Sequence, residues 1–175
     1  MLHVFRRLSL PSAFAMLALS APAVAQGTPP SESISGFERV PPSGLYNVIN
    51  HAARSCLAAP GNTSAATTYQ CIDSYTDQYW YLEPAEDGYY RLRNADKNEC
   101  LAMPWGGQGE HGTTYRCINS YHDQNWKIEK IDGDSYRLLN RKHDLCLSGG
   151  ASGYVTQELC VHDHWNQWWD FKLRD

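Results

Sequence analysis

The residues best suited to chemistry lie in a ten-residue segment that the chain repeats three times, at 71–80, 117–126 and 160–169. In each copy a cysteine is followed six residues later by Asp or Asn, then by Gln, any residue and Trp. These residues are Asp77, Gln78, Trp80, Asp123, Gln124, Trp126, Asn166, Gln167 and Trp169. Thiols, carboxylates or amides, and large aromatic groups at fixed spacing can form disulfides, hydrogen bonds and stacking contacts.

Motifs for catalysis do not accompany this segment. The sequence contains no Gly-x-Ser-x-Gly turn, no His-Glu-x-x-His pair and no P-loop. Its carboxylates are scattered over expected turns, and nothing selects two of them as a glycosidase pair. We therefore expect a protein that is not an enzyme and needs no cofactor.

The beginning of the chain has the features of an exported protein. Arg6 and Arg7 precede an apolar run at 8–19, and Ala23-Val24-Ala25 supplies the small residues that signal peptidase needs. That run is too short to span a bilayer, and no other run is long enough. We predict a removable signal at 1–25 and a secreted protein, extracellular or periplasmic.

Composition divides the rest of the chain into a lead-in and one domain. Residues 26–43 are rich in Pro, Ser and Gly, which predicts a flexible lead-in, and residues 44–175 fit one domain. Without the signal the chain has thirteen basic and nineteen acidic residues, a net charge of −6. This balance argues against nucleic acid or an anionic membrane as a partner.

All six cysteines lie in the predicted domain, two in each repeat. An even count in an exported chain favours disulfides, and of the fifteen possible pairings the repeat selects one. The predicted pairs are Cys56–Cys71, Cys100–Cys117 and Cys146–Cys160. No pair has the short spacing of zinc ligands. His111 and His162-Asp163-His164 lack a third ligand at suitable spacing, so we expect solvated loop histidines and no metal.

The repeat extends upstream, where a Tyr stands four residues before an Asn and that Asn six residues before a Cys-Leu step. The Asn residues are Asn50, Asn94 and Asn140. The period of about 45 residues indicates three similar parts that share one core. Apolar and polar residues alternate at 45–50, 89–94 and 135–140, and again from each repeated Trp. This predicts about twelve short strands, with Trp80, Trp126 and Trp169 in the core.

Three in-register Gln-x-Trp segments, with paired cysteines and a Cys-Leu step in each repeat, resemble the ricin B-type lectin domain. The resemblance covers nearly the whole mature chain, from about Gly44 to Asp175. It implies an all-β fold, a β-trefoil of three four-stranded lobes around a pseudo-threefold axis. It also implies that the protein binds glycans or glycoconjugates.

The resemblance implies a small sugar site in each lobe. In that family an aromatic residue two positions before the second cysteine stacks on the sugar, and the Asp or Asn before the Gln bonds its hydroxyls. The Gln itself is mostly tied to backbone groups but can approach the sugar. The matching residues are Tyr69, Asp77, Gln78, Tyr115, Asp123, Gln124, Asn166 and Gln167. In the third lobe Glu158 replaces the aromatic, so we expect no stacking platform there. Trp105, in a Gly-rich loop, is a further candidate contact.

One departure from the family concerns a carboxylate. Sugar-binding lobes of the family usually have Asp two residues after the first cysteine, where this chain has Ala58, Ala102 and Ser148. A hydrogen bond to a charged group is worth about 1.5–3 kcal/mol. The departure therefore argues against galactose binding in the family's usual manner.

Two functions from different classes follow. The first is a secreted carbohydrate-binding lectin, favoured by the retained Tyr69 with Asp77 and Tyr115 with Asp123. The alternative is a protein-interaction trefoil, similar to the binding subunits of the cytolethal distending toxins, which assemble with other protein subunits. The missing Asp residues and Trp105 favour this alternative. We rank the lectin first.

Overall fold

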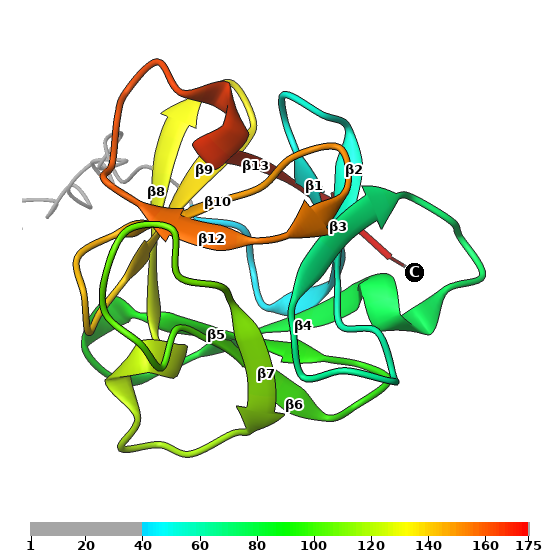
Figure 1. Cartoon of the computed structure of the whole chain (residues 1–175), viewed down its shortest axis with the longest axis horizontal. Coiled ribbons are helices and arrows are strands. Elements are labelled where there is room, and N and C mark those ends of the chain that lie inside the picture. Colours follow the sequence, from blue (N-terminus) through cyan, green and yellow to red (C-terminus); the bar gives the residue numbers. More distant parts are fainter. Residues whose placement is uncertain (1–39, 175) are drawn as a thin grey trace, which may run out of the picture. The chain divides into compact units, whose positions relative to one another are not determined.

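The computed structural model describes residues 40–174, which form short strands joined by turns (Figure 1). The predicted signal at 1–25 and residues 26–39 of the predicted lead-in lie outside the described range. Helices in residues 40–174 are three-residue 3-10 turns, and none is long or apolar enough to cross a membrane.

Each repeat supplies four strands. The first lobe contains β1 (Gly44–Asn50), β2 (Ser55–Ala58), β3 (Thr67–Gln70) and β4 (Tyr79–Pro84). The second contains β5 (Tyr90–Asn94), β6 (Glu99–Ala102), β7 (Thr113–Arg116) and β8 (Trp126–Asp132). The third contains β9 (Ser135–Asn140), β10 (Cys146–Ser148), β12 (Thr156–Glu158) and β13 (Trp168–Leu173). The 3-10 turns η1 (Thr76–Gln78), η3 (His122–Gln124) and η4 (Trp165–Gln167) precede the last strand of each lobe, and η2 (Glu86–Gly88) joins the first two lobes.

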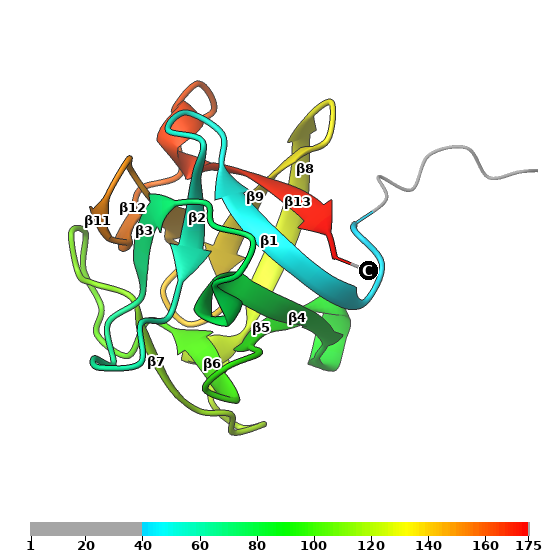
Figure 2. The ribbon, with the colours of Figure 1, turned by 90° about the vertical axis from the view of Figure 1, so that its right-hand side faces the viewer.

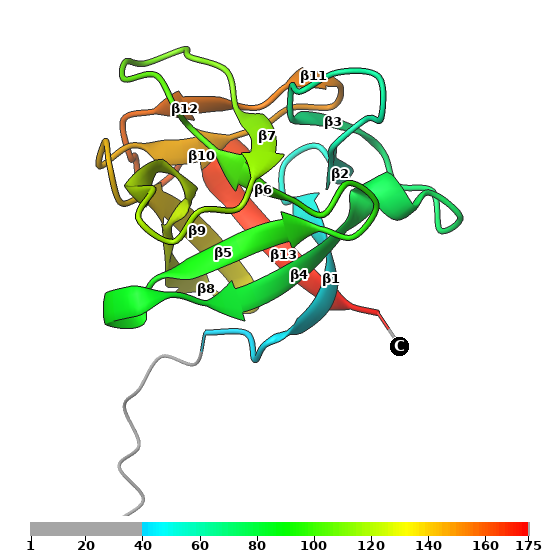
Figure 3. The same cartoon turned by 90° about the horizontal axis from the view of Figure 1, so that it is seen from below.

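Two strands from each lobe close into a six-stranded barrel. β1 pairs with β4, β4 with β5, β5 with β8, β8 with β9, β9 with β13, and β13 with β1. The hairpins β2–β3, β6–β7 and β10–β12 gather at one end of this barrel (Figures 2 and 3). This is a β-trefoil, and the predicted fold class is confirmed.

One strand was not expected from the sequence. β11 (Gly153–Tyr154), in the loop between the cysteines of the third lobe, pairs with β3 of the first lobe. The described residues therefore contain thirteen strands, where the repeat predicts about twelve. The extra pairing fastens the third lobe to the first.

The three repeated tryptophans lie in the core, as predicted. Trp80, Trp126 and Trp169 are fully buried, and each indole Nε1 donates to the carbonyl of the Leu in its own lobe's Cys-Leu step. The distances are 2.9 Å to Leu57, 3.2 Å to Leu101 and 3.0 Å to Leu147. A buried indole thus keeps its hydrogen bond while its rings fill the space between lobes.

A closed ring of backbone hydrogen bonds joins the three lobes. Ala66 N donates to Gly112 O at 2.9 Å, Gly112 N to Val155 O at 2.9 Å, and Val155 N to Ala66 O at 3.1 Å. All three residues are buried. Each comes from the loop between the cysteines of its lobe, so the ring ties the three loops together.

The disulfides have the predicted pairing. Cys56–Cys71, Cys100–Cys117 and Cys146–Cys160 each lie within one lobe, and no described cysteine is free. Each bond connects the strand after the repeated Asn to the loop that carries the 3-10 turn.

Gly112 has no room for a side chain, which gives a test of the backbone ring. A Cβ at this position would lie 2.6 Å from Val155 Cγ2 and 3.0 Å from Met103 Cε. We expect Gly112→Ala to lower the free energy of unfolding by about 1–3 kcal/mol, the usual cost of overpacking. Urea denaturation measures the change. Gly61→Ala is the matched control, because nothing lies within 4 Å of its added Cβ; equal stability of the two variants would contradict the prediction.

Reduction should destabilise the domain strongly. The disulfides span 15, 17 and 14 residues of sequence, and loops of this size are each worth about 3 kcal/mol. Together they are comparable to a domain's whole stability of about 5–15 kcal/mol. We expect reductant to lower the melting temperature sharply. An unchanged melting temperature, with complete reduction established by thiol titration, would show that the core suffices without them.

Candidate functional site

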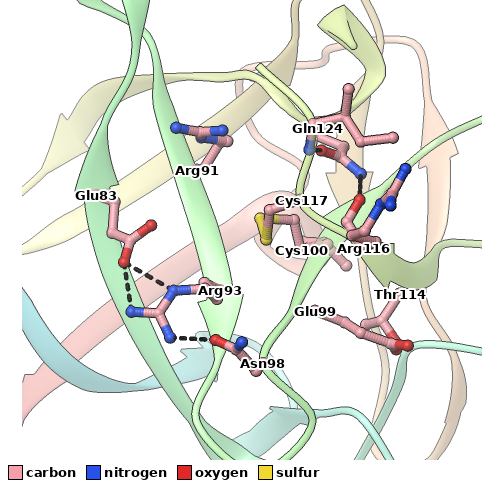
Figure 4. The surroundings of a disulfide bond; sticks show 12 residues. Glu83, Arg91, Arg93, Asn98, Glu99, Cys100, Thr114, Arg116, Cys117 and Gln124 are labelled. Carbon is pink, nitrogen blue, oxygen red and sulfur yellow. Dashed lines mark hydrogen bonds and ion pairs between the residues drawn. A yellow bond between two sulfur atoms is a disulfide. The ribbon is translucent and has the colours of Figure 1, made fainter. Parts of the chain in front are cut away.

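The repeated glutamines hold the second cysteine of each pair in place. Gln124 Oε1 accepts from Ile118 N at 2.8 Å, and its Nε2 donates to Arg116 O at 2.9 Å beside the disulfide (Figure 4). Gln78 and Gln167 make the same two bonds in their lobes. All three side chains are buried. The sequence made them candidate ligand contacts; their geometry gives them a positioning role, with both ends of each amide occupied by backbone.

The carbonyl before each Gln is a junction between lobes. It accepts one hydrogen bond from the backbone of its own lobe and one from the repeated Asn of the next lobe. Asp77 O accepts from Ala59 N at 2.9 Å and from Asn94 Nδ2 at 2.8 Å. Asp123 O accepts from Met103 N at 3.0 Å and from Asn140 Nδ2 at 2.9 Å. Asn166 O accepts from Gly149 N at 2.9 Å and from Asn50 Nδ2 at 2.8 Å. The backbone of the candidate site residue is thereby fixed while its side chain remains available.

Two lobes bring the predicted aromatic and carboxylate together. Tyr69 Oη donates to Asp77 Oδ2 at 2.5 Å, and Tyr115 Oη donates to Asp123 Oδ2 in the same way. Burial raises the pKa of both phenols well above the usual range, and the neighbouring Asp carboxylates raise it further. Each Tyr is therefore a neutral donor, and it orients the carboxylate beside it.

Sequence reasoning missed a second aromatic at each of these sites. Tyr75 and Tyr121, directly before the 3-10 turns, are 47% and 45% exposed. Their rings lie edge-on to Tyr69 and Tyr115, with centroids 6.3 and 6.2 Å apart. The signal was available, because Ser-Tyr stands at the same place in the first two copies of the segment. Each of these lobes thus offers two tyrosines and one carboxylate.

The second lobe also has a hollow at its carboxylate. Tyr121, His122, Asp123 and Lys142 line a space of about 300 Å³. Asp123 itself is buried, whereas Asp77 of the first lobe is half-buried. The two sites therefore share their chemistry but differ in how open the carboxylate is.

Trp105 is the remaining candidate contact from the sequence. Its side chain is 56% exposed, and its carbonyl accepts from Gln157 Nε2 at 2.5 Å. The neighbouring Pro104 carbonyl accepts from Lys142 Nζ at 3.0 Å, and Lys142 lines the hollow. Trp105 does not line the hollow, and its role as a ligand contact stays a prediction.

The positions where the family usually has Asp offer no charge. Ala58 and Ala102 are fully buried, and Ser148 is buried with its hydroxyl accepting from Asn166 Nδ2 at 2.9 Å. The third lobe also lacks the Tyr–Asp pair. Glu158 occupies the position of Tyr69 and Tyr115, and its carboxylate accepts from Thr156 Oγ1 at 3.2 Å.

The histidines of the described chain do not assemble into a metal centre. Among residues 40–174 no three His, Cys, Asp or Glu side chains are grouped as ligands. His111 stacks on Tyr154 with centroids 4.5 Å apart, and His162 lies edge-on to Trp168. Their contacts are with aromatic rings.

These features define a β-trefoil with surface sites of aromatic and carboxylate side chains. The family model described as "Ricin-type beta-trefoil lectin domain-like" matches residues 37–117 and 77–158. These overlapping matches span most of the chain, which belongs to this family. The resemblance seen in the sequence is confirmed. Comparison with curated proteins gives no match.

Solved structures share the fold at low sequence identity. The designed three-fold symmetric protein ThreeFoil is 19% identical, with a TM-score of 0.67 over 73% of this chain and 97% of its own. A ricin B-like lectin of Macrolepiota procera, in complex with lactose, is 14% identical, with a TM-score of 0.65 over 78% and 99%. A chain of the Haemophilus ducreyi cytolethal distending toxin is 17% identical, with a TM-score of 0.63 over 76% and 87%.

The raised phenol pKa values predict an alkaline loss of stability. Above the ordinary Tyr pKa of 10.0 the unfolded chain loses its phenolic protons before Tyr69 and Tyr115 do in the folded protein. The unfolded state then binds fewer protons, so the free energy of unfolding falls as the pH rises. Urea unfolding at about pH 9 and about pH 11, on either side of that pKa, measures this fall. The free energy of unfolding should fall less between the two pH values in the Tyr69→Phe, Tyr115→Phe double variant than in the wild type. An equal fall in both proteins would contradict the prediction.

Proposed function

We propose that this protein is a secreted carbohydrate-binding lectin whose first two lobes recognise glycans. The observation that carries the proposal is the duplicated arrangement of two tyrosines and one carboxylate, Tyr69, Tyr75 and Asp77 in one lobe and Tyr115, Tyr121 and Asp123 in the next. The three residues of each site lie close together on one lobe. Membership of the ricin-type family supports the same reading.

The chemistry of each site suits a sugar ring. A sugar presents an apolar face and a rim of hydroxyls, so a site needs an aromatic surface and nearby hydrogen-bonding groups. Tyr75 and Tyr121 supply exposed rings. Asp77 and Asp123 use Oδ2 to accept from a tyrosine, and no described residue donates to their Oδ1 atoms. Those oxygens are the proposed acceptors for sugar hydroxyls.

Each site should be weak, because Ala58 and Ala102 supply no charged partner for adjacent hydroxyls. A hydrogen bond to a charged group contributes about 1.5–3 kcal/mol, a large share of the roughly 4 kcal/mol behind a millimolar dissociation constant. Two weak sites on one rigid domain gain strength on a multivalent surface, provided that both can bind at once. We therefore infer glycans displayed at high density as the physiological ligands.

Binding is proposed without catalysis. A glycosidase needs two carboxyl groups about 5–10 Å apart on either side of the scissile bond. Each proposed site has one carboxylate, held by a tyrosine hydroxyl. Export is proposed from residues 1–25, and the three disulfides suit an oxidising compartment.

A second candidate function is that of a protein-binding subunit in a secreted, toxin-like assembly. It is favoured by an aromatic patch of Trp165, Trp168 and His51, in which Trp165 is 59% exposed. The corresponding positions of the other lobes have no tryptophan. Exposed aromatic residues of this kind are common at protein interfaces.

Substitution of the tyrosines that hold the two carboxylates tests the lectin proposal. A glycan array first identifies a neutral ligand, and titration calorimetry then measures its affinity for the variants. We expect Tyr69→Ala and Tyr115→Ala each to weaken glycan binding at the altered lobe. A lost aromatic contact of about 1–1.5 kcal/mol corresponds to an affinity about tenfold lower. The double variant should bind almost nothing, and Glu158→Ala should match the wild type.

Tyr81→Ala is the matched control for these variants. Tyr81 is exposed on β4, outside both proposed sites, so its loss should leave glycan affinity unchanged. Wild-type affinity in the double variant, with folding verified by circular dichroism, would sink the lectin proposal. Absence of any ligand on a broad array would place the protein-binding function first.

A further inference from the structure

A hollow lies in the third lobe, where the sequence predicts no stacking platform. Its volume is about 520 Å³, within the range of about 300–1,000 Å³ typical of ligand sites. Its lining includes Ser148, Tyr154, Glu158, His164 and Asn166. It does not belong to the proposed sites of the first two lobes.

The hollow results from a change of side chains within the repeat. In the first two lobes a tyrosine ring on the strand donates to an Asp before the Gln. In the third lobe the strand position is Glu158, and the position before the Gln is Asn166. The third lobe therefore has its carboxylate on the strand and not on the 3-10 turn, and it lacks the tyrosine ring that the other two lobes have at that strand position.

Glu158 is a negative group without a cationic partner. It is half-buried, makes no ion pair with any described residue, and accepts one hydrogen bond from the neutral Thr156 hydroxyl. No Lys or Arg lines the hollow, and His164 is its one basic side chain. A partly buried carboxylate without a counter-charge favours a cationic ligand, because the ligand restores the lost electrostatic stabilisation.

The aromatic ring of Tyr154 also lines this hollow. Tyr154 is 56% exposed, and its backbone is held on β3 by the unexpected strand β11. His111 stacks on the ring with centroids 4.5 Å apart and an interplanar angle of 27°. Tyr154 is therefore a fixed surface against which a sugar ring or an ammonium group can lie.

The remaining lining suits a sugar more than an isolated ammonium ion. Asn166 donates to Ser148, which fixes both side chains. Gln108 and Thr156 add neutral polar groups to the wall. The space is far larger than one ammonium group, and its polar side chains can bond several hydroxyls.

We propose that the third lobe is a separate binding site for an amino sugar, whose ammonium group pairs with Glu158 and whose ring lies against Tyr154. The site differs in ligand class from those of the first two lobes, which take neutral sugars. The domain would then bind two kinds of sugar on a glycan surface, neutral sugars through the first two lobes and amino sugars through the third.

Two oligosaccharides that differ only at nitrogen test this inference. The glucosamine trimer carries amines, and the N-acetylglucosamine trimer carries neutral amides on the same ring. Titrations followed by two-dimensional NMR at about pH 6.5, below the pKa of about 7.7–8 of a peptide α-amino group, the nearest analogue of a sugar amine, should show at least tenfold tighter binding of the glucosamine trimer. The side-chain amide signal of Asn166 should shift during this titration.

Variants separate this site from the others. Glu158→Gln keeps the shape and removes the charge, so it should weaken binding of the glucosamine trimer by about tenfold or more. Tyr154→Ala should weaken it too, and it provides a second route if Glu158→Gln is poorly folded. The Tyr69→Ala, Tyr115→Ala double variant should bind the amine trimer like the wild type, although it loses neutral glycans.

Several results would overturn the inference. They are equal binding of the two trimers, no binding of the glucosamine trimer, and wild-type affinity in folded Glu158→Gln and Tyr154→Ala. Loss of amine binding in the Tyr69→Ala, Tyr115→Ala variant would also exclude the third lobe as its site. A lysine-containing peptide that binds where the glucosamine trimer does not would replace the amino sugar with a protein ligand. The results with Glu158→Gln and Tyr154→Ala and the shift of the Asn166 signal do not depend on whether the first two lobes bind neutral glycans.

Discussion

The backbone carbonyl that precedes each repeated Gln is the point on which the architecture depends. Each carbonyl accepts from the backbone of its own lobe and from the Asn of the following lobe, and the third lobe completes the set with Asn50 of the first. A buried Asn amide left without this acceptor would lose a hydrogen bond in a dry environment, which costs about 1–3 kcal/mol. Lobe folding and lobe assembly are therefore coupled, because the same atom serves both.

This coupling separates residues that must repeat from residues that are free to differ. The Gln, Trp and Asn side chains are buried and satisfied within the protein. Each Gln serves its own lobe, whereas each Asn bonds a carbonyl of another lobe, so a change of an Asn affects two lobes. Two positions of each lobe lie outside that framework. They are the strand residue two positions before the second cysteine and the residue before the Gln. Tyr and Asp occupy these positions twice, and Glu and Asn once. The side chains at these two positions can therefore differ between lobes while the buried Gln, Trp and Asn contacts stay the same.

Prediction from the sequence succeeded where one lobe repeats another. The Trp core and the disulfide pairing follow from in-register copies, since equivalent residues meet equivalent surroundings. The Tyr–Asp partners came from the family resemblance, and their role in binding stays a prediction. It failed where a feature depends on contacts between lobes or on a single copy. The strand β11 needs β3 from a different lobe, and the third-lobe hollow reflects the absence of a ring. For the glutamines, the resemblance predicted mainly a bond to backbone groups with some approach to the ligand, but periodicity does not reveal that backbone occupies both ends of each amide. Tyr75 and Tyr121 repeat in register, but a repeated Tyr does not by itself indicate whether its ring is buried or exposed.

The pairing of β1 with β13 has a consequence for how the domain is made. Asn50 bonds a carbonyl 116 residues further along the chain, and one edge of β1 is completed by β13, the last strand of the third lobe. β1 can meet β4 early, but its other edge exposes unpaired backbone groups until the third lobe arrives. Open strand edges of this kind recruit other chains, and contacts between distant residues form slowly. Pairing of β1 with β13 therefore removes an open edge that a partly folded chain would present to other chains.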